Sequence, residues 1–94
     1  MPVYKLEPLE GMEGHSGWRA SHIIMEVWLR AHDPEDARKK MALATATTLE
    51  GYEAGQLIPY SPWLNSAVVS CDEDDSRDVP DGVVLLGNGK TITL

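Results

Sequence analysis

Three histidines and one cysteine are the residues of this sequence most suited to metal binding or catalysis. They are His15, His22, His32 and Cys71, and no two of them have the short spacing of zinc ligands. His22 and His32 fall on or beside one expected strand, which would hold them about 33 Å apart if it is fully extended. The sequence therefore predicts neither a metal site nor a bound cofactor.

Cys71 would need one of the histidines as its base to act as a nucleophile. It shares one face of an alternating run with Ala67 and Val69, where a lone cysteine behaves as a small core hydrophobe. Four carboxylates follow it directly, and their charge raises the pKa of a thiol and suppresses the thiolate. Glu26 is expected to be a surface charge. We predict no catalytic residue, which argues against an enzyme without excluding one.

Residues 72–81, DEDDSRDVPD, hold six acids and one base, and so five of the seven net negative charges of the chain. Counted as a calcium loop from Asp72, the run has Arg77 where glycine is required and Val83 where a bidentate glutamate is required. It is expected to be a solvated acidic loop. The acids that we single out in it are Asp72, Glu73, Asp74, Asp75 and Asp78.

The tripeptide Gly89-Lys90-Thr91 matches the end of a phosphate-binding loop. That motif needs a glycine five residues earlier, where this chain has Val84. Asn88-Gly89 lies between two apolar runs and instead predicts a β-hairpin with a type I′ turn, in which both turn residues have positive φ.

The elements that position these residues fit one small domain over residues 1–94. The chain is 43% hydrophobic and 24% charged, which is enough for a single core. Its net charge of −7 disfavours nucleic acid as a partner. No membrane span or signal peptide is visible, and a lone cysteine is compatible with a reducing compartment, so we expect a cytoplasmic protein.

Alternating apolar and polar residues predict strands over 2–8, 18–31 and 66–71, with two more flanking the hairpin turn. Asp33-Pro34 predicts the start of a helix that ends at Gly51 or Gly55. Its buried stripe would comprise Ala37, Met41, Ala44 and Thr48, joined by Tyr52 in the longer version. The sequence thus predicts an α+β fold, with an antiparallel sheet of about five strands and one main helix on one face, in the order β-β-α-β-β-β.

A single helix covers only one face of such a sheet, so the other face is expected to carry Ile24, Trp28 and Val68. The C-terminal loop, residues 55–65 or a partner would cover this patch. Our first hypothesis is a protein-interaction or assembly module. It would use this face or an edge strand to bind a second copy, as a homodimer, or another protein.

Two other hypotheses remain open. A small enzyme or ligand-binding protein would have its pocket between the loops at 9–17 and 55–65, with walls formed by Trp18, His22, Tyr60 and Trp63. An antitoxin-like or regulatory subunit would dock on a basic partner through the acidic loop at 72–81.

Overall fold

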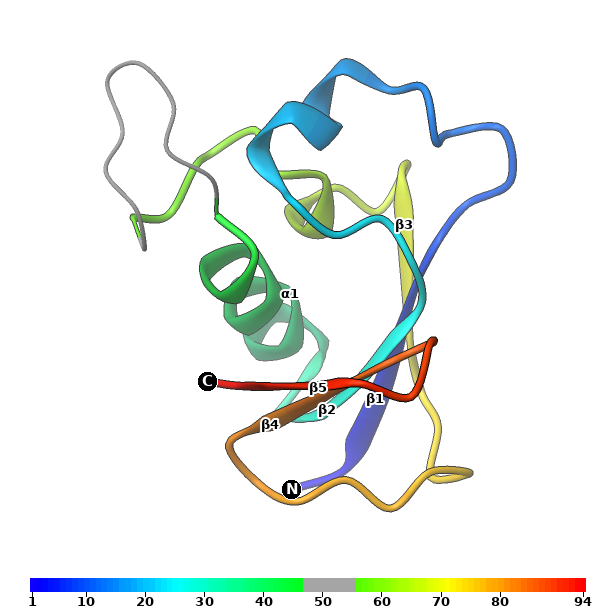
Figure 1. The fold of residues 1–94 in the computed structure, drawn as a ribbon, viewed down its shortest axis with the longest axis vertical. Coiled ribbons are helices and arrows are strands. Elements are labelled where there is room, and N and C mark those ends of the chain that lie inside the picture. Colours follow the sequence, from blue (N-terminus) through cyan, green and yellow to red (C-terminus); the bar gives the residue numbers. More distant parts are fainter. Residues whose placement is uncertain (47–55) are drawn as a thin grey trace.

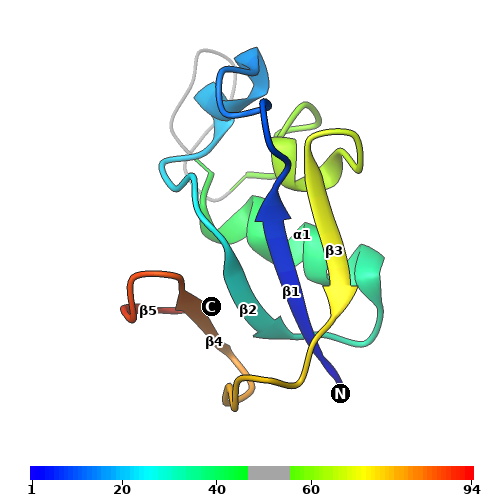
Figure 2. The same ribbon diagram turned by 90° about the vertical axis from the view of Figure 1, so that its right-hand side faces the viewer.

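The computed structural model describes residues 1–46 and 56–94 of the chain. One antiparallel sheet has the strand order β3-β1-β2-β4-β5, and helix α1 lies across one of its faces (Figures 1 and 2). The elements are β1 (Val3–Pro8), β2 (Val27–Arg30), α1 (Pro34–Ala44), β3 (Val69–Glu73), β4 (Val83–Leu86), β5 (Thr91–Thr93) and two 3₁₀ helices, η1 (Ser16–Ala20) and η2 (Pro62–Leu64). The predicted α+β class and element order are confirmed.

Helix α1 begins where the sequence predicts. The Asp33 carboxylate accepts a hydrogen bond from the Asp36 N–H at 2.7 Å, and Pro34 occupies the first turn. The Asp36 carboxylate in turn accepts the His32 N–H at 3.0 Å. This bond, helped by nearby Lys40, holds the pKa of the Asp36 carboxyl below its usual range. The helix start is therefore fixed by side chains that satisfy its free N–H groups.

The predicted end of the helix is wrong. Helix α1 stops at Ala44, and the Thr45 hydroxyl donates to the Met41 carbonyl at 2.7 Å. Beyond it, Ala46 forms an isolated bridge with Ser21, and the Thr45 carbonyl accepts the His22 N–H. These tertiary contacts take up the backbone groups that a longer helix would use. The proposed later positions Thr48, Gly51, Tyr52 and Gly55 lie outside the described residues.

The predicted strand at 18–31 is also too long, because only residues 27–30 pair in the sheet. Its first part forms η1, which starts where the His15 Nδ1 accepts the Gly17 N–H at 2.9 Å. The Ser21 hydroxyl then bonds both the N–H and the carbonyl of Ile23. Local side-chain hydrogen bonds thus replace the sheet ladder before β2.

The two faces of the sheet carry two separate apolar clusters. Toward α1, Leu6, Val27 and Leu29 are fully buried in the main core together with Met41 and Trp63. On the opposite face a smaller cluster contains Val3, Trp28 and Val79, with Val83 and Leu85 partly buried beside it. The predicted division of residues 27–30 between the two faces therefore holds.

Residues 74–82, which we call the acidic strap, cover the face that was expected to be bare. Val79 is fully buried in the cluster with Trp28. The Arg77 guanidinium lies 4.9 Å from the centre of the Trp28 ring and the Lys5 amine 5.3 Å from it. Trp28 is consequently only 6% exposed. The strap, rather than residues 55–65, covers this face.

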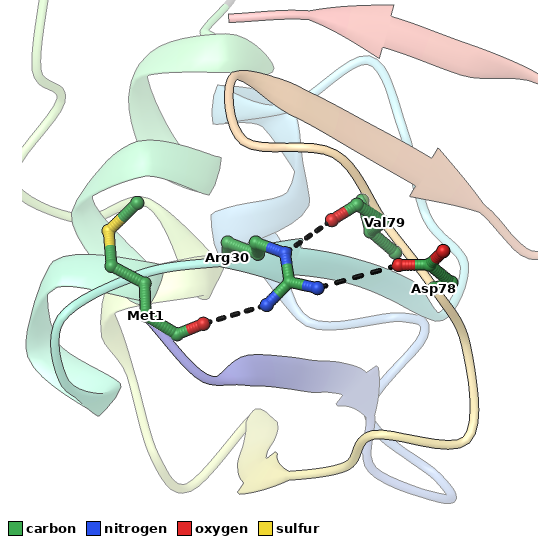
Figure 3. Close-up of polar contacts among 4 residues, drawn as sticks. All are labelled: Met1, Arg30, Asp78 and Val79. Carbon is green, nitrogen blue, oxygen red and sulfur yellow. Dashed lines mark hydrogen bonds and ion pairs between the residues drawn. The ribbon is translucent and has the colours of Figure 1, made fainter.

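Arg30 ties the strap to the sheet (Figure 3). Its Nε donates to the Val79 carbonyl at 2.6 Å, and its Nη1 donates to the Met1 carbonyl at 2.8 Å. Its Nη2 lies 3.5 Å from the Asp78 carboxylate. One planar guanidinium therefore joins β2, the chain start and the strap.

Two further sequence predictions need correction. Asp72 and Glu73 belong to β3 rather than to a loop, because Asp72 pairs with Lys5 and Glu73 with Tyr4 in the ladder to β1. The hairpin between β4 and β5 is present, but no described residue other than glycine has positive φ. Gly89, at φ 86°, donates to the Leu86 carbonyl, which is typical of a type I turn followed by a left-handed glycine and not of type I′.

Replacing Arg30 with lysine keeps the charge but removes the planar fork that reaches three oxygens. Losing one or two such bonds at this partly exposed site costs about 1–2 kcal/mol, so we expect the strap to open about tenfold more often. Limited trypsin digestion measures this opening as the rate of cleavage after Arg77. Cleavage after Lys90, in the hairpin turn, is the internal control. Equal rates of cleavage after Arg77 in the unaltered protein and in Arg30→Lys would contradict the role given to Arg30.

Candidate functional site

A pocket of about 540 Å³ lies between η1 and the segment that contains η2. Residues 15–17 and 19 form one side, and residues 59–61 and 64–66 form the other. Its volume falls within the range of small-molecule sites. The pocket lies where the sequence placed it, between a glycine-punctuated loop and a proline-containing one.

Two tryptophans hold the two sides of the pocket together. Trp18 of η1 and Trp63 of η2 pack edge to face, with ring centres 5.5 Å apart and planes at 89°. The Trp18 indole N–H donates to the Met12 carbonyl at 2.9 Å, and that of Trp63 donates to the Ser21 hydroxyl at 3.0 Å. Both rings are buried with satisfied N–H groups, so they position the walls rather than form them.

Of the four predicted wall residues, Tyr60 alone lines the pocket, and it is 50% exposed. His22 lies elsewhere on the surface, with its Nδ1 3.0 Å from the Thr45 carbonyl. Sequence reasoning missed His15, Arg19 and Ser61. Arg19 escaped notice because it was assigned to a strand, whereas η1 brings it to the pocket beside His15.

Gly17 brings the two sides of the pocket into close approach. A Cβ at this position would lie 3.1 Å from the Tyr60 carbonyl oxygen and 2.9 Å from the His15 Nδ1. A larger residue would therefore have to push the two segments apart. Since His15 Nδ1 accepts the Gly17 N–H, the neutral imidazole carries its proton on Nε2, which is then a hydrogen-bond donor.

The charge and polarity of the lining differ from those of the chain as a whole. The chain has fifteen acids against eight lysines and arginines, yet the lining residues that the structure describes include Arg19 and His15 and no carboxylate. The Ser61 hydroxyl is buried and has no hydrogen-bond partner among the described residues. A buried polar group left unpaired costs about 1–3 kcal/mol, so a ligand that bonded Ser61 would recover part of that cost. The pocket is suited to a small polar molecule that carries negative charge.

The three residues of the expected interface do not form an exposed patch. Ile24 is 46% exposed, but Trp28 lies under the strap and Val68 is 1% exposed in the main core. The prediction that Trp28 and Val68 lie on an uncovered face is wrong, because the strap covers Trp28 and Val68 belongs to the main core on the other face. Pairing with a protein partner through a strand edge stays a prediction.

The acids of residues 72–81 mostly face solvent. Asp72, Glu73, Asp75 and Asp78 are exposed. Asp74 accepts the Ser76 N–H at 2.9 Å, and Ser76 is the main reason that the pKa of this carboxyl lies below its usual range. The buried indole N–H of Trp28 makes no full hydrogen bond among the described residues, yet it lies close enough to Asp74 to lower this pKa slightly further. Docking of these acids on a basic partner stays a prediction.

The part of the chain that the structure describes has neither a metal-ligand cluster nor a membrane-spanning helix. No group of three His, Cys, Asp or Glu side chains there is arranged to hold a metal ion. No helix in it has the length and apolar character to cross a bilayer. Comparison with protein-family models, with curated proteins and with solved structures finds no match to this chain.

Cys71 is partly buried in β3, with its Sγ 3.7 Å from the Pro34 carbonyl oxygen. Burial raises the pKa of the thiol, and the Asp72 carboxylate raises it further, while the Arg38 guanidinium works in the opposite direction. Such a thiol carries little thiolate near neutral pH and is a poor nucleophile.

We therefore expect Cys71 to react with iodoacetamide more slowly than free cysteine at about pH 8. Because the pKa is raised, the rate should keep rising further into the alkaline range than that of free cysteine. Mass spectrometry follows the alkylation, and the chain unfolded in urea is the control, since it loses the burial that raises the pKa. Equal rates for the folded and unfolded chains at about pH 8 would contradict the assignment.

Proposed function

We propose that the protein binds a small organic anion in the pocket between η1 and residues 59–66. The observation that carries this proposal is that the described residues of the lining include Arg19 and His15 and no carboxylate, in a chain of net charge −7. Arginine recognises carboxylate and phosphate oxygens with a rigid fork of donors. The Nε2–H of His15 and the hydroxyl of Ser61 add neutral hydrogen-bonding groups.

The architecture around the pocket supports a preformed site. The edge-to-face contact of Trp18 and Trp63 and the close approach at Gly17 fix η1 against the segment at 59–61. A site that is already formed loses less entropy when it binds a ligand. Ligand binding, the second hypothesis from the sequence, is preferred to an interaction through the open sheet face, because the strap covers that face.

Titration with small molecules, followed by ¹⁵N–¹H NMR, tests the proposal. The probes are matched carboxylates, phosphates, neutral amides and amines of similar size, each at about 1 mM or above. We expect the two anionic classes to shift the signals of residues 15–19 and 59–66, and the amines to leave them unchanged. Amines that shift these signals as strongly as anions, or anions that shift none, would overturn the proposal.

A pair of variants separates the pocket from general charge. We expect Arg19→Gln to weaken anion binding at least about tenfold, because it removes a charge-assisted contact. Lys39→Gln removes the same charge from the exposed surface of α1, away from the pocket, and should leave the affinity unchanged. Equal losses in the two variants would mean that the anion responds to net charge and not to this pocket.

A further inference from the structure

Among the described residues the sheet has two edge strands, β3 and β5. An edge strand presents unpaired backbone N–H and C=O groups, and proteins protect such edges with charges or by occupying those groups. One edge of this sheet is protected in these ways and the other is not. The sequence did not predict which strands form the edges.

The β3 edge is protected in two ways. Asp72 and Glu73 lie on the strand, so an antiparallel pairing of two copies there would bring carboxylates together. The outward-facing Val69 carbonyl already accepts a hydrogen bond from the Arg38 guanidinium at 2.8 Å. A second strand is therefore disfavoured at β3.

The β5 edge has neither kind of protection. Its residues Thr91, Ile92 and Thr93 are uncharged. The Leu86 N–H donates to the Lys90 carbonyl and the Leu94 N–H to the Gly82 carbonyl. Hydrogen-bonded positions alternate along an antiparallel pair, so Ile92 faces β4 and the backbone groups of Thr91 and Thr93 face outward. These two residues present a neutral edge ready to pair.

We propose that β5 pairs antiparallel with β5 of a second copy, about a two-fold axis at Ile92. Thr91 then lies opposite Thr93 of the partner subunit, and Thr93 opposite the partner's Thr91. In this register every outward N–H and C=O of both threonines finds a partner, which makes four hydrogen bonds across the axis. The two sheets become one continuous sheet, and the interface is isologous.

The side chains around this edge suit the same register. Ile92 pairs with Val84, is half-buried against the main core, and would meet the partner's Ile92 at a close, non-hydrogen-bonded position. On the same side of the sheet, Leu43 and Leu94 line an apolar groove of about 270 Å³ between α1 and β5. They are 44% and 45% exposed, and a neighbouring subunit would cover part of both.

The acids of β3 do not oppose a second copy at this edge. The acids Asp72 and Glu73 lie at the opposite edge, four strand spacings or about 19 Å away, which exceeds the Debye length of about 8 Å at physiological salt. Neutral, symmetric Thr-Ile-Thr is complementary to itself. The contact is short, so we expect a weak dimer with a dissociation constant between about 1 μM and about 1 mM.

Analytical ultracentrifugation from about 10 μM to about 1 mM tests the proposal on the whole chain. We expect a reversible monomer–dimer equilibrium. Thr93→Pro removes an outward N–H that makes no bond within the subunit, and should raise the dissociation constant at least tenfold. Circular dichroism and the NMR signals of residues 15–19 report whether the variant still folds. A monomer throughout this range, or an undiminished dimer of folded Thr93→Pro, would overturn the proposal.

A second pair of variants tests the register without proline. Thr91→Lys with Thr93→Lys places two like charges opposite each other twice across the axis and should abolish the dimer. Thr91→Lys with Thr93→Glu places opposite charges there and should restore it, more strongly at low salt. If both double variants dimerise equally, β5 is not the interface. The test is independent of the ligand pocket, which lies on other residues.

Discussion

The fold depends on the cover that Trp28 receives from the acidic strap. A five-stranded sheet with one helix leaves an apolar face without a layer, and here Val3, Trp28 and Val79 form a second small core on it. The strap buries Val79 against this face and keeps its carboxylates in solvent. Arg30 fixes the arrangement, because its guanidinium donates to two backbone carbonyls, that of Val79 in the strap and that of Met1.

The position of the strap also explains where the negative charge of the molecule lies. Five of the seven net negative charges come from residues 72–81, and most of these residues form the strap. The strap crosses the end of the sheet opposite to η1 and η2 (Figures 1 and 2). The six residues of β1 span about 20 Å between these ends, which is more than a Debye length. Arg19 can therefore present a local positive field in an acidic protein, with His15 beside it as a hydrogen-bonding group.

The sequence predicted those elements whose signals are local and regular. Asp33-Pro34 specified the helix start through its own hydrogen bonds, and the alternation at 27–30 assigned each side chain to its face. It failed where the decisive partner is distant in the chain. Helix α1 stops just before the isolated bridge between Ser21 and Ala46, and neither residue signals that contact by its type. Periodicity assigns a residue to a face but does not reveal what covers that face.

The pocket shows the same limit at the level of side chains. It lies between parts of the two loops that the sequence named, where Gly17 permits the close approach to Tyr60. Aromatic residues were expected to line it. Trp18 and Trp63 are instead buried against each other, and each indole N–H donates a hydrogen bond within the protein, which is more stable than exposing the rings in a pocket. The smaller polar residues are left to line the pocket. The two buried tryptophans thus position the segments on either side of the pocket. The polar residues next to them in sequence line it and determine which ligands it suits.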